Sequence, residues 1–173
     1  MVEVAVARLG LDSATNSYVV ILREKHGRRL LPIWIGQPEA ESIVMQLNHV
    51  KRERPLTHDL CKALIIALGG ELRRVHISRV QKSTYFAELH LEGHDGWVQL
   101  DARPSDSIAI ALRMDAPIFA DESLLTGIDD DEGDDTPSTG PMLLPSSTGE
   151  LTAEQLKAYL ANLQPEDFGK FTP

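Results

Sequence analysis

The chain has 173 residues, 42% of them hydrophobic, and a single cysteine, Cys61; this fits one domain with a buried core and excludes a disordered chain or an internal disulfide. No stretch reaches the ~18 apolar residues of a membrane span and no secretion leader begins the chain, so we expect a cytoplasmic protein without a membrane partner. The negative charge is concentrated after residue 120, where the sequence has 2 Lys or Arg residues and 12 Asp or Glu residues. Residues 1–120 have 15 Lys or Arg residues and 14 Asp or Glu residues, so the net charge of −9 comes from the last part of the chain.

The first third of the chain predicts three strands. Valines alternate with other residues over residues 2–7, which is the period of a half-buried strand. Turn-forming residues 12–16 lead to a second strand at about residues 17–23, and a Lys-His-Gly turn leads to a third at about residues 29–35. Because a parallel crossover needs a dozen or more residues, these short turns predict an antiparallel meander.

Two helices are predicted next. Pro38 suits the first turn of one helix, whose apolar residues continue to Leu47. The second begins near Thr57, which we expect to be its N-cap, and ends at two glycines, residues 69–70. Helical spacing places a set of apolar residues on one face of the second helix: Leu60, Ala63, Leu64, Ala67 and Leu68.

The next segment predicts three more strands, a third helix and a last short strand. Apolar alternation marks strands around residues 75–77 and 85–91, and a His-Asp-Gly hairpin signal leads to a strand at residues 97–101. Pro104 opens a helix, and residues 117–120 predict the last strand. Because strands and helices come in blocks, we predict an α+β fold, in which a mainly antiparallel sheet packs with three or four helices.

The composition divides the chain into three parts. Residues 1–128 form the predicted domain, and residues 129–149, rich in Asp, Gly, Pro, Ser and Thr, read as an acidic flexible linker. Residues 150–173 predict an amphipathic helix and a tail, with Thr152 and Gln155 as a capping box. The apolar stripe of that helix needs a surface, on the same body or on a sister subunit, and the acidic residues can cover a basic patch in place of a polyanion.

Two polar segments near helix starts are candidates for chemistry. In residues 36–41, Glu39 either binds a metal or only complements the helix dipole. In residues 51–60, Arg54 and its basic neighbours precede a helix start that carries His58 and Asp59. This combines a phosphate-attracting patch with a proton-transfer residue and a carboxylate, or it is a solvated loop before a capped helix.

A third polar segment, residues 101–107, places Arg103 between Asp101 and Asp106 at a strand-to-helix junction. Metal-assisted phosphodiester hydrolysis needs carboxylates around Mg²⁺ or Mn²⁺ and a cation on the developing charge. The alternative is structural, with Asp106 capping its helix and Arg103 paired to Asp101. The sequence holds no Gly-rich phosphate loop, dinucleotide fingerprint, zinc-ligand spacing or nucleophile elbow.

Three ordered motifs resemble the signature blocks of the bifunctional nuclease domain family. They are Leu-Pro-Ile-Trp-Ile-Gly at residues 31–36 with Glu39, Arg-Pro-Leu-Thr-His-Asp-Leu at residues 54–60, and Ala-Arg-Pro-Ser-Asp-Ser-Ile-Ala at residues 102–109. The resemblance covers about residues 2–126, and the segment after Gln164 is also similar to C-terminal segments of bacterial members.

The resemblance implies an α+β fold, frequent homo-oligomers and an RNase and DNase activity that takes its name from plant members. We expect a metal-dependent nuclease (a hydrolase) acting on RNA or DNA, with Mg²⁺ or Mn²⁺ as cofactor. A non-catalytic domain that binds a nucleotide, a nucleic acid or a protein is the alternative. The candidate residues are His58, Asp59, Arg103 and Asp106 for catalysis, Arg54, Thr57 and Ser105 for phosphate, and Glu39, Asp59 and Asp106 for the metal.

Overall fold

The fold is described from a computed structural model, in which residues 1–12 and 17–127 are described. The predicted linker at residues 129–149 and the helix and tail at residues 150–173 lie outside the described residues. Those two assignments, and the domain boundary at residue 128, therefore stay predictions.

In the described part of the chain, seven strands form one sheet. Its order is β3-β2-β1-β7-β4-β5-β6, and every neighbouring pair is antiparallel except β4 with β7. The mainly antiparallel sheet predicted from the short turns is therefore confirmed. The strands are β1 Val2–Asp12, β2 Ser17–Glu24, β3 Leu30–Ile35, β4 Glu71–Gln81, β5 Thr84–Gly93, β6 Gly96–Ala102 and β7 Ile118–Ala120.

The sheet consists of two meanders, β1–β3 and β4–β6, and the short strand β7 lies between β1 and β4 and joins them. Lys82 and Ser83 connect β4 to β5 with φ values of 49° and 61°. Two residues with positive φ match the right-handed twist of the flanking strands. The predicted hairpin at residues 94–96 is confirmed, and Gly96 has φ 109°, a conformation that L side chains rarely adopt.

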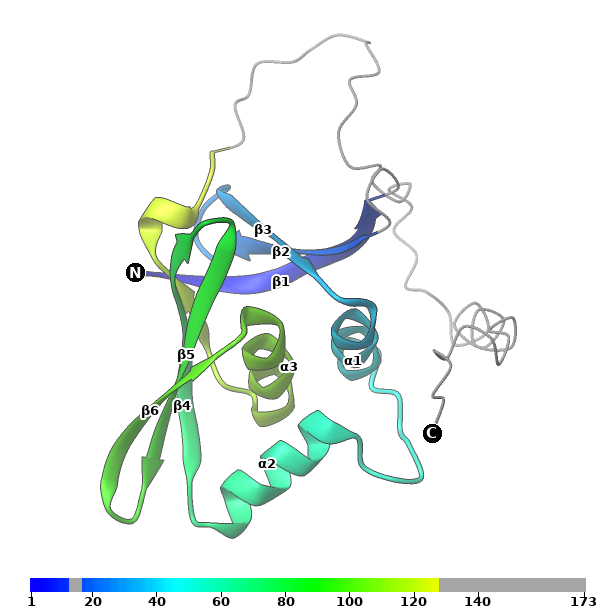
Figure 1. Ribbon diagram of the computed structural model, residues 1–173, viewed down its shortest axis with the longest axis vertical. Helices are drawn as coiled ribbons and strands as arrows, with labels where there is room; N and C mark the ends of the chain where they lie inside the picture. The colour runs from blue at the N-terminus through cyan, green and yellow to red at the C-terminus, as the bar shows by residue number, and fades with distance from the viewer. Residues whose placement is uncertain (13–16, 128–173) are drawn as a thin grey trace, which may run out of the picture. The chain divides into compact units, whose positions relative to one another are not determined.

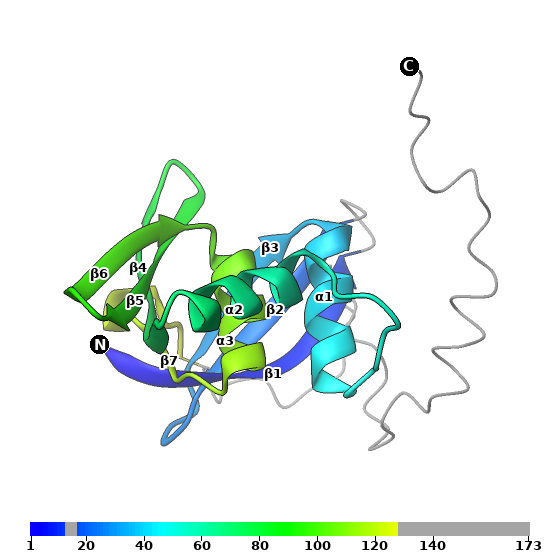
Figure 2. The same cartoon turned by 90° about the horizontal axis from the view of Figure 1, so that it is seen from below.

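Three α-helices complete the described fold, within the predicted range: α1 Gln37–Leu47, α2 Thr57–Ala67 and α3 Pro104–Met114, with a short 3₁₀ helix η1 at Glu122–Leu124. Figure 1 shows α1 and α3 side by side, below β1–β3 and to the right of β4–β6, with α2 beneath them. Seen from below in Figure 2, α2 lies over α3. A proline lies in the first turn of both α1 and α3, where its missing N–H costs no hydrogen bond.

The core forms where α3 packs on β4 and β5, and α1 packs on β2 and α3. Ala109 and Ala111 of α3 are fully buried, and their small side chains leave room for the neighbouring helix and strands. Large buried side chains of the strands and of α1 and α3 fill the remaining space: Val20, Leu22, Leu31, Ile43, Val75, Ile77 and Ile108.

Helix α2 is packed differently from α1 and α3. The predicted apolar positions do share one face, but that face is exposed, with Leu60, Leu64 and Leu68 at 52%, 51% and 76%. Helix α2 packs on the core with its opposite side, through Cys61 and Ile65. No helix in residues 1–12 and 17–127 is long and apolar enough to cross a membrane.

Two adjacent isoleucines of α2 test this orientation. Ile65 packs on the core, whereas Ile66 is 56% exposed. We expect Ile65→Ala to lower the free energy of unfolding by about 2 kcal/mol, because it leaves a cavity. Ile66→Ala should change that free energy by less than about 0.5 kcal/mol. Urea denaturation measures both, and equal losses would contradict the orientation of α2.

Candidate functional site

The starts of the three helices bring the signature blocks together. Glu39 lies in the first turn of α1, His58 in the first turn of α2, and Arg103 and Asp106 at the start of α3. With Ser42 of α1 they form one bonded group, which we name the helix-junction cluster. The positive end of each helix dipole lies at the first turn, and this favours carboxylates and bound anions there.

Arg103 connects the two acidic residues of the cluster. Its Nη2 lies 2.8 Å from Glu39 Oε1 and 3.1 Å from Asp106 Oδ1, and its Nε lies 2.7 Å from Asp106 Oδ2. The two carboxylate oxygens that bond this nitrogen are therefore at most 5.9 Å apart. The Arg103 side chain is 67% exposed, so it can move without disturbing the core.

His58 links Asp106 to the buried side of α1. Its Nε2 lies 3.0 Å from Asp106 Oδ1, and its Nδ1 lies 2.8 Å from Ser42 Oγ. With its proton on Nε2, His58 donates to Asp106 and accepts from the serine hydroxyl. Ser, His and Asp are the residue types of a hydrolase triad, but Ser42 is only 4% exposed and cannot reach a substrate.

The network keeps Asp106 ionised. Burial alone would raise the pKa of Asp106, but hydrogen bonds from Arg103 and His58 outweigh burial and hold the pKa below its usual 3.8. The hydrogen bond to Asp106 in turn raises the pKa of Arg103. Both groups are therefore charged at neutral pH, and Asp106 presents a carboxylate that can bind a cation.

Asp59 makes a separate set of contacts. Its Oδ2 accepts from the Leu56 backbone N–H at 2.8 Å, and its Oδ1 accepts from Arg113 Nε at 2.6 Å. The predicted N-cap at Thr57 is wrong, because Leu56 occupies that position and Asp59 supplies the capping hydrogen bond instead. The carboxylate of Asp59 thus holds the start of α2 against α3.

Arg113 is the buried cation of the helix assembly, with only 5% of its surface exposed. Besides Asp59, its guanidinium donates to the Ala109 carbonyl at 2.9 Å and to the Ser42 carbonyl at 3.3 Å. Burial is the largest single effect on Asp59 and would raise its pKa. The hydrogen bonds from the Leu56 amide and from Arg113 together outweigh burial, so the pKa of Asp59 is lowered. A buried guanidinium needs such partners, because an unpaired charge in the interior is costly.

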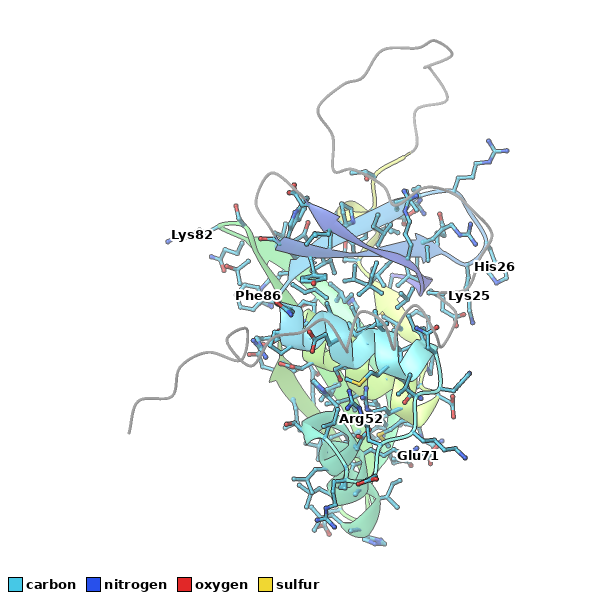
Figure 3. All side chains as sticks on the ribbon, turned by 90° about the vertical axis from the view of Figure 1, so that its right-hand side faces the viewer. Lys25, His26, Arg52, Glu71, Lys82 and Phe86 are labelled. Carbon is cyan, nitrogen blue, oxygen red and sulfur yellow. The ribbon has the colours of Figure 1, made fainter. Side chains whose placement is uncertain are left out.

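A surface pocket of about 440 Å³ adjoins Asp59 and Arg113, on the loop between α1 and α2. Lys51, Arg52 and Arg54 contribute its basic character. Arg52 is seen in Figure 3 between α1 and α2, and its guanidinium donates to Met45 Sδ at 3.1 Å. The pocket is completed by Gln46, Val50, Glu53, Pro55 and Leu56.

The remaining candidate residues lie around these two features. Thr57 is exposed at the first position of α2, whereas Ser105 is buried in the first turn of α3 at 7% exposure. Asp101 of β6 is opposite Glu88 of β5, whereas Arg103 bonds Glu39 and Asp106. The roles assigned to the candidate residues stay predictions.

The helix-junction cluster contains the ligand type of a hard divalent cation. Carboxylate oxygens are the ligands that Mg²⁺ and Mn²⁺ prefer, and Glu39 and Asp106 supply them side by side. In the structure the positive charge between the two carboxylates is the guanidinium of Arg103, which bonds both of them. Asp59, the third predicted metal ligand, is engaged by Leu56 and Arg113 instead.

Sequence reasoning did not single out Ser42 or Arg113. Ser42 lies next to Ile43 on the buried side of α1, and only the fold shows that its hydroxyl meets His58. Arg113 follows the apolar positions of α3, and a basic residue beside such a stripe is usually solvated. The sequence signal that could have identified Arg113 is its position one helical turn after the buried Ala109.

Comparison with known proteins gives consistent matches. Residues 20–130 match the bifunctional nuclease domain. An uncharacterized protein of Mycobacterium tuberculosis is 39% identical over 171 residues, which is 97% of this chain and 98% of the relative. Bifunctional nuclease 2 of Oryza sativa subsp. japonica is 31% identical over 65% of this chain and 36% of its own length, and that of Arabidopsis thaliana is 31% identical over 64% and 35%. The plant matches thus concern one part of longer proteins.

The lowered pKa of Asp59 predicts how stability depends on pH. Its contribution is present above the ordinary value of 3.8 and is lost as the pH falls through the lower pKa of the folded state, because the unfolded chain then binds more protons. We expect Asp59→Asn to be less stable at pH 7 by about 1–2 kcal/mol and to lose less stability on acidification. Urea denaturation between pH 7 and pH 3 measures this, and parallel pH profiles would contradict it.

Proposed function

Because the chain belongs to the bifunctional nuclease domain family, as its signature blocks predicted, we propose that it is a metal-assisted nuclease that hydrolyses RNA or DNA phosphodiesters. The observation that carries the proposal is the bonded network of Glu39, His58, Arg103 and Asp106, which come from all three signature blocks. Residues so far apart in the sequence meet at the point where three helix dipoles favour a phosphate.

In this proposal Glu39 and Asp106 hold Mg²⁺ or Mn²⁺. Such a cation supplies charge neutralisation at a phosphate and a more acidic bound water. With a cation held by these two acids, the exposed guanidinium of Arg103 would bind a non-bridging phosphate oxygen. In the structure Arg103 bonds both acids.

The substrate strand is proposed to run from the cluster toward the basic pocket. Arg54 is exposed and lines that pocket, and Thr57, which lies between Arg54 and His58 in the sequence, is exposed at the start of α2. Both can bind further phosphates. The buried Ser105 would contribute through the backbone amides of the first turn of α3 rather than through its hydroxyl.

His58 and Asp59 are proposed to position the site. Both ring nitrogens of His58 are engaged, and its side chain is only 12% exposed, so it orients Asp106 rather than meeting water directly. Asp59 fixes the start of α2, and with it His58, through Leu56 and Arg113. Loss of either should shift the geometry of the carboxylates without removing them.

Cleavage of single- and double-stranded RNA and DNA, with Mg²⁺ or Mn²⁺ and with a chelator, tests the proposal. We expect metal-dependent cleavage that falls about 100-fold or more in Glu39→Gln and in Asp106→Asn, because each substitution removes a cation ligand while keeping the side-chain shape. Glu41→Gln is the matched control, since Glu41 also lies on α1 but bonds Gln37.

Two results would contradict the assignment. Cleavage that persists in the double variant Glu39→Gln/Asp106→Asn would place catalysis elsewhere. Cleavage that is absent from the wild-type protein with either metal would leave the domain without the proposed activity. Circular dichroism of each variant shows whether it remains folded.

A second candidate, a non-catalytic nucleic-acid-binding domain, is favoured by the ion pairing of the acids. Arg103 bonds Glu39 and Asp106, and Arg113 bonds Asp59. If this arrangement is permanent, the protein binds RNA or DNA through Arg54 and its basic neighbours without cutting it. Salt-dependent binding that weakens in Arg54→Gln, with no cleavage in any metal, is the outcome that selects this function.

We also propose that the protein is a homo-oligomer assembled through the exposed face of α2. Leu60, Leu64 and Leu68 form an apolar surface, and Gly69 after them lies against His94 in the turn that begins β6. Strand β6 is an edge of the sheet and exposes further apolar residues: Trp97 at 68%, Val98 at 48% and Leu100 at 46%. An exposed edge beside an apolar face suits a second copy of the chain.

Light scattering after size-exclusion chromatography tests the oligomer. We expect the double variant Leu64→Glu/Leu68→Glu to have a smaller mass than the wild type, because charge on this face opposes burial. Val80→Glu is the control, since Val80 is 45% exposed on β4 and lies outside this surface. A monomeric wild-type protein at high concentration would contradict the proposal.

A further inference from the structure

A second cluster of ligand-type side chains lies on the sheet, on a different element from the helix-junction cluster. His76 of β4 is directly opposite Glu88 of β5, and His90 is two residues further along β5. Residues two apart in a strand share a face, as do directly opposed residues of antiparallel strands. The three side chains therefore project from one face, the face opposite to the buried Val75 and Leu89.

The side chains of this group are close enough to share one ion. His90 Nε2 lies 3.6 Å from Glu88 Oε2, and His76 Nδ1 lies 3.9 Å from the same oxygen. One ligand atom from each residue lies within 4.8 Å of the other two. Two ligands each about 2.0–2.2 Å from a Zn²⁺ ion are separated by roughly 3.3 Å in a tetrahedral site, so a small movement closes the group around a cation.

Several buried polar atoms in and around the group have no hydrogen-bond partner. Among the described residues, four buried side-chain nitrogen or oxygen atoms have no partner: Arg74 Nε, His76 Nε2, Ser78 Oγ and His90 Nε2. All four belong to β4 or β5, and two belong to the group itself. Buried polar atoms are nearly always bonded in native proteins, so this concentration on one sheet region indicates a missing ligand.

The chemistry and exposure of the group also suit a metal. An unprotonated imidazole nitrogen offers its lone pair to a cation. Asp121 adds a negative charge near His76, while Arg74 adds a positive one. The side chains of His76, Glu88 and His90 are 15–20% exposed, which is open enough for an ion to enter.

We propose that His76, Glu88 and His90 form a binding site for one transition-metal cation of the Zn²⁺ class. Two imidazoles and one carboxylate are the ligands that Zn²⁺ takes, whereas Mg²⁺ prefers oxygen alone. Three protein ligands leave one position for water or for a group from a bound molecule. A cation bound there would link β4 to β5. This proposal does not rest on the proposed nuclease function.

Isothermal titration of the metal-free, tag-free full chain with Zn²⁺, in the presence of millimolar Mg²⁺, tests the proposal. We expect one Zn²⁺ per chain and a Kd at least about tenfold weaker in His76→Gln and in His90→Gln. His26→Gln is the matched control, because His26 is exposed in the β2–β3 turn (Figure 3) and lies outside the group. Asp106→Asn should bind Zn²⁺ like the wild type, which separates this site from the helix junction.

Co²⁺ provides a second measurement that reports the ligands directly. We expect visible absorption bands of four- or five-coordinate Co²⁺ in the wild type and in His26→Gln, and their loss in the double variant His76→Gln/His90→Gln. Zn²⁺ should also raise the Tm of the wild type and not that of the double variant, whose folding in the chelator is checked by circular dichroism. Stoichiometric binding retained by the double variant, or no binding by the wild type at micromolar Zn²⁺, would overturn the proposal.

Discussion

The buried guanidinium of Arg113 is the interaction on which the helix assembly depends. From α3 it reaches Asp59 at the start of α2 and the Ser42 carbonyl of α1, so one side chain joins all three helices. A charge that is 95% removed from solvent tolerates few arrangements, because leaving it without partners costs several kcal/mol. The positions of α1 and α2 on the central helix α3 are therefore restricted.

This restriction builds the helix-junction cluster. Once the helix starts are fixed, His58 meets Ser42 on one side and Asp106 on the other, and Arg103 spans Asp106 and Glu39. Each carboxylate is neutralised by an arginine, so the residues of the proposed site also stabilise the helix assembly. A nuclease would exchange one of these arginine contacts for a metal ion, whereas a binding domain would keep them.

Polar and apolar surfaces are separated on the molecule. The basic pocket and the helix junction lie at the starts of the helices, whereas the exposed leucines of α2 continue toward its end, where Gly69 meets the β5–β6 turn. The His76 group lies on the sheet face that the helices do not cover. Assembly through α2, as proposed, leaves the pocket and the metal group as separate functional surfaces.

Short-range patterns in the sequence determined the α+β class, the order of the strands and helices, the first meander, the hairpin at residues 94–96 and the family, because periodicity, turns and motifs act over a few residues. They also selected Glu39, His58, Arg103 and Asp106 as candidates. Only the tertiary structure decided that α2 turns its leucines outward, that Asp59 serves as a cap and a partner of Arg113, and that His76 joins Glu88 and His90. These outcomes depend on contacts between residues dozens of positions apart, where burial and long-range pairing outweigh local pattern.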